Sequence, residues 1–377
     1  MSKFSFHRPV LAKSFCDALS GSGLADARSG MFLAAPRRVG KSTFLREDLM
    51  PEIINRKWLP VYVDLWADKS ADPAILISEA IKMSISKLDG LVAKAAKSVG
   101  LDKINLGGFV LDMNKAGLPD GVTVSDALTK LATISGSPVV LIVDEAQHAL
   151  KTPSGLNLMF ALKAARDALN TSHGMPGLML VFTGSHRDKL AHLVLKRDQP
   201  FFGASITSFP LLGYDFAAAF TSWVNANLAD NNFLSPDAVY EAFKLLGHRP
   251  EMLRNIIGQI AIAGESGNLS GILKDKAAEF HGMIWDEMAS EFASLNITQK
   301  AVLQTIILKR GGQYSPFSED SMTEYQKIIG GEPVSASTIQ SALDSLREKG
   351  LVWNPSRGMY ALEDDGLAEW YFRTNDI

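Results

Sequence analysis

The chain has 377 residues, a length that accommodates two or three domains. Its 46 % hydrophobic and 21 % charged content is ordinary for a globular protein, and no apolar run approaches the ~20 residues that cross a bilayer. The net charge of −3 provides no overall basic field for nucleic acid. Residues 1–8 lack the apolar core of a signal peptide, and Cys16 is the only cysteine. We therefore expect a cytoplasmic protein without disulfides or membrane contacts, with Cys16 packed in a helix.

The first predicted elements are a helix, a strand and a second helix. Leu11, Phe15 and Leu19 recur at near-fourfold spacing, which predicts a helix over residues 8–24. The apolar residues 31–34 then predict a short buried strand, and a helical pattern opens at Thr43. Residues 35–43 thus connect a strand to a helix.

This connection reads Ala-Pro-Arg-Arg-Val-Gly-Lys-Ser-Thr, a phosphate-binding P-loop in which Ala35 replaces the first glycine. Backbone N–H groups of such a loop cradle a triphosphate at a helix N-terminus, while Lys41 supplies a charge and the Ser42 hydroxyl reaches Mg²⁺. Arg37 and Arg38 face either the phosphates or the surface, where a neighbouring subunit or glutamates would meet them. The nucleotide-binding residues predicted here are Arg38, Val39, Gly40, Lys41, Ser42 and Thr43.

A second motif lies about 100 residues further along the chain. The apolar run 139–143 predicts a buried strand that ends at Asp144 and Glu145. Asp144 would hold the metal through water, and Glu145 would polarise a water for in-line attack on the γ-phosphate. The two motifs together predict a Mg-nucleotide site with a hydrolytic base.

The remaining pattern up to residue 214 alternates strands with helices. Strands are predicted at 59–65, 178–182 and 206–209, helices at 73–91, 123–135 and 156–169, and a Gly-rich hairpin between 99 and 121. The helix 123–135 is expected to be capped at Thr123 or Ser125. Five strands in this alternation predict an α/β fold with a doubly wound parallel sheet, which binds ligands at its carboxyl edge.

Two small polar residues follow the strand 178–182. At the end of the strand beside the Asp-Glu motif, Thr183 and Ser185 would touch the γ-phosphate or position the attacking water. Small polar residues at a strand end are also ordinary turn chemistry, so both interpretations stay open.

The rest of the chain is mostly helical. Four helices over 216–292 have the size of a lid, and helices at 298–309, 323–329 and 335–349 followed by a hairpin over 351–362 predict a winged helix. The expected domains are 1–214, 215–296 and 297–377. A DNA-binding winged helix would use Ser337, Gln340, Ser341, Arg347 and Arg357. Residues 297–377 carry 8 Lys and Arg against 11 Asp and Glu, however, and this balance favours a packing or protein-contact role over direct DNA binding.

The motifs at 36–43, 144–147 and 183–185 and the ending at 360–373 resemble the archaeal-type AAA+/STAND-like P-loop ATPases, whose core, lid and winged helix would cover nearly the whole chain. The resemblance implies ATP rather than GTP, because no NKxD motif is present. It implies that Phe6, His7 and Arg8 contact the adenine base of the nucleotide. The alternative is that these residues only fasten the first helix to the sheet.

The resemblance also implies a γ-phosphate-sensing arginine at the start of a lid helix. Arg249 is the first candidate for this role and Arg254 the second, and either would otherwise be a surface cation. Two features depart from the family pattern. Relatives commonly carry an arginine just before the last core strand, and residues 199–204 lack it, so any arginine finger reaching a neighbouring subunit would have to be Arg197 or Arg187. Glu251 also interrupts the usual lid motif. The oligomeric state therefore stays open.

Three functions are compatible with these features. The first is an ATPase whose nucleotide state repositions lid and winged helix to control a DNA or protein partner. The second is an ATP-sensing, DNA-binding regulator with little turnover, against which Glu145 argues because a binding module needs no base. The third, a small-molecule kinase, fits poorly with a lid and a winged helix.

Overall fold

The computed structural model describes residues 4–375 except 69, 99–116, 120, 173, 175, 229–231, 310–313 and 357, and for 89–98 it describes the backbone alone. Arg357 and most of the predicted hairpin between 99 and 121 lie outside the described residues. No described helix is long and apolar enough to cross a membrane.

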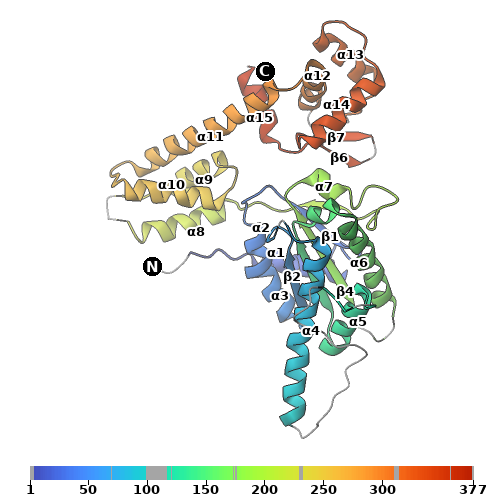
Figure 1. Ribbon diagram of the computed structural model, residues 1–377. Coiled ribbons are helices and arrows are strands. Elements are labelled where there is room, and N and C mark those ends of the chain that lie inside the picture. The colour runs from blue at the N-terminus through green and yellow to red at the C-terminus, as the bar shows by residue number, and fades with distance from the viewer. Residues whose placement is uncertain are drawn as a thin grey trace.

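A five-stranded parallel sheet forms the centre of the first part of the chain (Figure 1). Its strands are β1 (Met31–Ala34), β2 (Leu59–Asp64), β3 (Val139–Asp144), β4 (Leu178–Gly184) and β5 (Ile206–Ser208), in the order β2-β3-β4-β1-β5. β3 is buried along its whole length, as the continuous apolar run of a central parallel strand requires. The α/β fold with a parallel sheet predicted from the sequence is confirmed.

Helices cover both faces of this sheet. Because side chains alternate along β1, Phe32 packs against the layer of α4, α5 and α6, and Leu33 packs against the layer of α1 and the P-loop helix. The helices are α1 (Pro9–Ser20), α2 (Lys41–Phe44) with the π-helical turn Leu45–Leu49 and α3 (Met50–Asn55), α4 (Pro73–Ser98), α5 (Val124–Ser135), the 3₁₀ helix Ala146–Lys151, α6 (Pro153–Thr171) and α7 (Arg187–Ala191).

Helix boundaries follow from local capping. α1 ends four residues before the predicted end, because Gly21 takes φ +70° and closes its C-terminus. α5 begins after Thr123, which is the N-cap and not Ser125, and the Thr123 side chain forms a capping box with Asp126. Cys16 is buried in α1.

Four helices with their own apolar cluster follow the sheet. They are α8 (Tyr214–Asn225), α9 (Pro236–Leu245), α10 (Pro250–Ile262) and α11 (Leu269–Ala293). The N-terminal segment joins this cluster: the rings of Phe4 and Phe6 lie 5.9 and 5.5 Å from that of Phe216 on α8. The start of the chain therefore bridges the sheet region and the four helices.

The C-terminal part contains α12 (Ile297–Leu308), α13 (Glu319–Ile329), α14 (Ala336–Glu348), β6 (Val352–Ser356), β7 (Met359–Leu362) and α15 (Gly366–Thr374). Helices and hairpin have the winged-helix arrangement, while α15 was not predicted. α11 links this part to the preceding one (Figure 1), since Leu273 packs in the cluster of α8–α10 and Phe292 packs against Trp370 of α15.

The start of α6 provides a stability test. A Cβ atom on Gly155 would lie 2.2 Å from the Ala149 carbonyl oxygen, whereas one on Gly258 in α10 meets nothing within 4 Å. Gly155→Ala should lower the free energy of unfolding by about 1–3 kcal/mol, because backbone must move to admit the methyl group. Gly258→Ala should leave it equal or raise it by up to about 1 kcal/mol. Urea unfolding followed by circular dichroism measures both, and equal values for the two variants would contradict the packing at Gly155.

Candidate nucleotide-binding site

A cavity of about 700 Å³ opens at the carboxyl edge of the sheet. The P-loop, the N-terminal segment and the helices α8 and α10 all contribute to its wall, and the four helices α8–α11 are called the lid below. The P-loop and the strand ends contribute residues 36–44, Glu47, Asp48, Asp64, Trp66, Asp144 and Glu145, and the N-terminal segment and lid contribute Phe4, Ser5, Phe6, Arg8, Leu212, Phe216, Phe220, Pro250, Glu251 and Arg254.

The P-loop connects β1 to the helix that begins at Lys41. Gly40 precedes this helix with φ +88°, a conformation that favours glycine, and Arg38 at the apex takes φ +67°. Val39 is buried against the helices, so its side chain anchors the loop while the flanking residues face the cavity. All six nucleotide-binding residues predicted here line the cavity.

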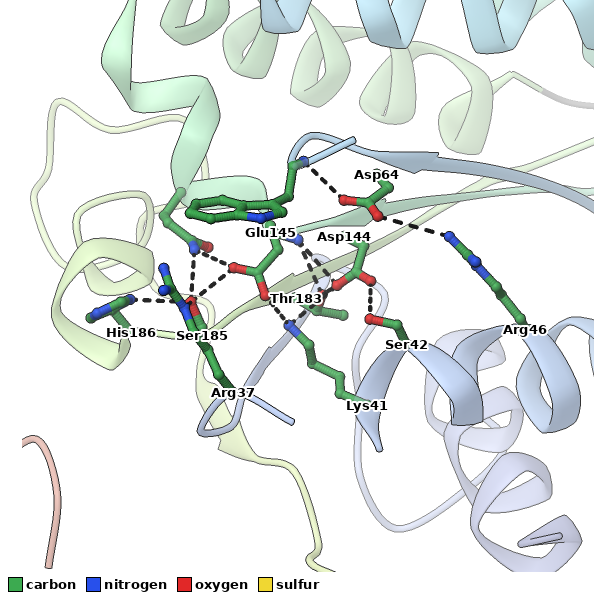
Figure 2. A network of polar contacts seen from close by, with 12 residues as sticks. Arg37, Lys41, Ser42, Arg46, Asp64, Asp144, Glu145, Thr183, Ser185 and His186 are labelled. Carbon is green, nitrogen blue, oxygen red and sulfur yellow. Dashed lines mark hydrogen bonds and ion pairs between the residues drawn. The ribbon is translucent and has the colours of Figure 1, made fainter. Parts of the chain in front are cut away.

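Lys41 joins the two motifs that lie about 100 residues apart. Its ammonium group is 3.2 Å from Asp144 Oδ1 and 2.9 Å from Glu145 Oε1, and its side chain is 6 % exposed (Figure 2). Buried charges are costly unless they are paired, so this arrangement requires all three side chains.

Asp144 is the centre of the polar network. Oδ2 accepts hydrogen bonds from Ser42 at 2.6 Å and Tyr62 at 3.0 Å, and Oδ1 accepts one from Thr183. Burial acts to raise the pKa of Asp144, but Lys41 and these hydrogen bonds outweigh it and hold the pKa below its ordinary value. The carboxylate is therefore ionised at neutral pH, as a metal ligand must be.

Glu145 occupies a less common backbone conformation, with φ +57°. Its Oε2 accepts hydrogen bonds from Gln147 and, at 2.9 Å, from Ser185. Burial acts to raise its pKa, yet Lys41, Gln147 and Ser185 bring the pKa below the ordinary value. Glu145 is thus an ionised carboxylate at the cavity wall, in the protonation state that a general base needs.

Thr183 and Ser185 have different surroundings. Thr183 is fully buried and bonds Asp144, so its hydroxyl orients the metal-ligand candidate instead of facing the cavity. Ser185 lies one residue past β4 and contacts Glu145, Gln147 and His186. Both residues therefore act on the carboxylates, and Ser185 is the one beside the candidate base.

The N-terminal segment lines the opposite end of the cavity. The Arg8 guanidinium lies over the rings of Phe44 and Phe209, at 5.8 and 5.2 Å, and donates to the Pro210 carbonyl at 2.8 Å. Phe6 packs against the lid and also reaches the cavity wall. These positions suit the flat ring of a nucleobase. The same contacts also fasten the N-terminal segment to the sheet region and the lid.

The structure separates the two lid arginines. Arg254 lines the cavity, whereas Arg249 does not and instead has its guanidinium near Met252 Sδ, at 3.9 Å. Arg249 precedes α10 as its N-cap, and the helix turns Arg254 toward the cavity one turn later. The position of Arg254 at the cavity wall therefore favours the second candidate over the first.

Three further side chains complete the site without having been singled out. Tyr62 on β2 reaches Asp144 because β2 pairs with β3 in register, and Gln147 reaches Glu145 from the 3₁₀ helix that follows it. Trp66 lines the cavity just past β2. A sequence signal exists only for Gln147, which lies two residues after Glu145 and belongs to the motif at 144–147.

These residues fit a magnesium ion if phosphate and water oxygens complete its set of ligands. Within the described part of the chain, no three His, Cys, Asp or Glu side chains are grouped as a metal site. Mg²⁺ does not require such a group, since it is commonly held by one or two protein oxygens, phosphates and water. Ser42 and Asp144, whose oxygens already lie 2.6 Å apart, would supply those protein oxygens.

Thr183 permits a test of this network. Thr183→Val removes the hydroxyl that orients Asp144 but keeps the side-chain shape, so Mg-dependent nucleotide affinity should fall about 10–100-fold. Thr183→Ser, which retains the hydroxyl, is the control. Titration of a fluorescent ATP analogue with Mg²⁺ and with EDTA measures the effect, and an equal loss in both conditions would show that Thr183 does not act through the metal.

No family model matches the sequence, and no curated protein does either. Solved structures do match. The Walker-type ATPase of Pyrococcus abyssi is 18 % identical, with 97 % of this chain and 95 % of that chain covered and a TM-score of 0.54. The ORC2 protein of Aeropyrum pernix is 15 % identical. In its ADP form, 97 % of this chain and 95 % of that chain are covered, with a TM-score of 0.55. In its ADPNP-ADP complexes, 97 % of this chain and 91 % of that chain are covered, with a TM-score of 0.51. At such low identity the likeness concerns the fold alone, and the chain shares the fold of these two proteins over nearly its whole length.

Proposed function

We propose that the protein binds ATP with Mg²⁺ and hydrolyses it. The observation that carries this proposal is the meeting of Lys41, Ser42, Asp144 and Glu145 at one edge of the sheet. A nucleotide-binding structure needs only the first three, while an ionised glutamate beside them, here half-buried at the cavity wall, is what hydrolysis requires.

Each residue then has a defined task. Backbone N–H groups of the P-loop and the Lys41 ammonium bind the phosphates, and Ser42 and Asp144 hold the metal, which when bound neutralises phosphate charge. Glu145 accepts the proton of the attacking water. Lys41 now pairs with both carboxylates, so an incoming triphosphate would take over this cation and release Glu145 toward water.

A nucleotide in the cavity would contact the lid as well as the P-loop. Arg254 and Glu251 at the start of α10 share the cavity with the P-loop, so ligand binding would change the lid's position relative to the sheet. α11 extends from the lid into the winged helix, which would transmit this change. Such coupling requires only that ATP bind the two arrangements with different affinity.

The winged helix contacts the ATPase core through α7. Arg347 of α14 forms a bidentate ion pair with Asp188, with N–O distances of 2.9 and 3.2 Å. The Glu363 carboxylate accepts hydrogen bonds from the backbone N–H groups of Arg187 and Asp188. Of the two interpretations open for Arg347, DNA reading and a packing or protein-contact role, this ion pair supports packing against the core in the present arrangement. Ser337 and Ser341 of the same helix are exposed.

We propose that the partner, DNA or protein, engages the winged helix when it leaves α7. Domains 1–214, 215–296 and 297–377 would be the moving units. The buried Cys16 fits the cytoplasm. The alternative is an ATP-sensing DNA-binding regulator with little turnover, and the placement of Glu145 beside Lys41 favours hydrolysis.

The first experiment measures ATP hydrolysis with and without duplex DNA, with Lys41→Ala as the blank. Glu145→Gln should keep ATP binding and lower turnover at least about 100-fold, the scale of a lost general base. Turnover unaffected by Glu145→Gln would remove this residue from the mechanism. Tight ATP binding without wild-type turnover would favour the regulator, and stimulation by DNA would identify the partner class.

The contact at α7 provides a separate prediction. Asp188→Asn leaves the winged helix unchanged but weakens hydrogen bonds to a charged group, worth about 1.5–3 kcal/mol each, so the docking equilibrium constant should fall at least about tenfold. Small-angle scattering should then show a larger radius of gyration. Asp26→Asn, at an exposed pair with Arg28, is the control. An unchanged radius would mean that other contacts hold the winged helix.

A further inference from the structure

Arg37 lies at the γ-phosphate end of the cavity. It is the third residue of the P-loop and lines the cavity wall with its neighbours. Its Nε is 3.5 Å from Ser185 Oγ, and Ser185 donates to Glu145 Oε2 (Figure 2). The guanidinium is therefore on the same side of the site as the candidate base.

An aromatic platform holds the Arg37 side chain. Its guanidinium carbon lies 4.7 Å from the centre of the Trp66 ring, a cation–π distance, and the Trp66 ring in turn lies 4.6 Å from that of His148. Burial and nearby cations including Lys151 and Arg37 lower the pKa of His148 to about 4, so this ring is neutral at neutral pH and does not repel the arginine. Stacking leaves the N–H edge of the guanidinium available for a ligand.

The charge of Arg37 is available as well. Asp144 and Glu145 both pair with Lys41. Among the ion pairs between described residues, none involves Arg37, whose side chain is exposed toward the cavity. A guanidinium that is held by a ring and has no carboxylate partner suits an anionic ligand, and its planar fork of N–H groups matches phosphoryl oxygens.

We propose that Arg37 is a catalytic residue that contacts the γ-phosphoryl group of ATP in its own subunit. This inference rests on the proposed hydrolysis of ATP. In that reaction the water oxygen forms a bond to Pγ, the bond from Pγ to the β–γ bridging oxygen breaks, and the water proton goes to Glu145. Negative charge on the phosphoryl oxygens and on the leaving ADP oxygen is then stabilised by the guanidinium. Trp66 is a positioning residue for Arg37.

The test compares Arg37→Ala and Arg37→Lys with wild type in steady-state hydrolysis. Arg37→Ala should lower kcat at least about 100-fold with KM changed less than about threefold, because the contact strengthens in the transition state. Arg37→Lys should recover only part of kcat. Arg28→Ala, an exposed arginine paired with Asp26 outside the cavity, is the control for surface charge.

Two further measurements report on the arginine itself. Guanidinium ion added to Arg37→Ala should raise kcat, and binding of ADP with aluminium fluoride, which resembles the transferred phosphoryl group, should weaken far more than binding of ADP. Trp66→Phe should lower kcat less than Arg37→Ala. Equal loss of ADP and ADP–aluminium fluoride affinity would show that Arg37 only binds nucleotide, which overturns the proposal.

Mixing experiments decide which subunit the arginine serves. Arg37→Ala and Lys41→Ala proteins mixed together should remain inactive if Arg37 acts in its own subunit, and recovery of turnover would overturn that assignment. Failure of the inference is distinguishable from failure of the proposed function. Lys41-dependent turnover with a normal kcat for Arg37→Ala rejects the role of Arg37 alone, whereas absence of turnover in wild type rejects hydrolysis itself.

Discussion

A buried ammonium shared by two carboxylates organises this protein. Lys41 and Asp144 are almost inaccessible to solvent, so neither charge is tolerable without the other. Their pairing fixes the P-loop helix against β3 and sets the distance between the phosphate-binding loop and Glu145. Under the proposed function, a triphosphate in the cavity would compete with these carboxylates for the same ammonium. Nucleotide binding and the freedom of the candidate base would then be coupled through one cation.

The strand order extends this coupling toward the winged helix. β4 lies between β1 and β3, so its carboxyl end delivers Thr183 to Asp144 and Ser185 to Glu145. The chain continues from Ser185 through His186 into α7, whose first N–H groups and Asp188 bind the winged helix. A few consecutive residues thus contact the candidate base at one end and the C-terminal part at the other. A change at either end has a short covalent path to the other.

The cavity itself is assembled from three separate stretches of chain. The sheet supplies the polar end, while Phe4 and Phe6 from the N-terminal segment and Phe216 from α8 supply an apolar end. Because these rings belong to the lid's own hydrophobic cluster, a movement of the lid would carry the N-terminal segment with it or break its contacts. The shape of the apolar end of the cavity therefore depends on lid position.

Local patterns were sufficient to predict the parallel sheet, the P-loop and the helices on either side, because apolar runs, capping residues and the phosphate-binding loop depend on neighbours in the chain. They also indicated that Lys41, Ser42, Asp144 and Glu145 would meet, since parallel strands share one carboxyl edge. The sequence by itself thus determined the fold class and the residues of the polar end. Only the tertiary structure decided that Tyr62 bonds Asp144, that Arg254 and not Arg249 lines the cavity, and that Arg347 binds Asp188. These contacts depend on strand register, on the face a helix turns to its neighbour and on the docking of one domain on another, and none of these is specified by adjacent residues.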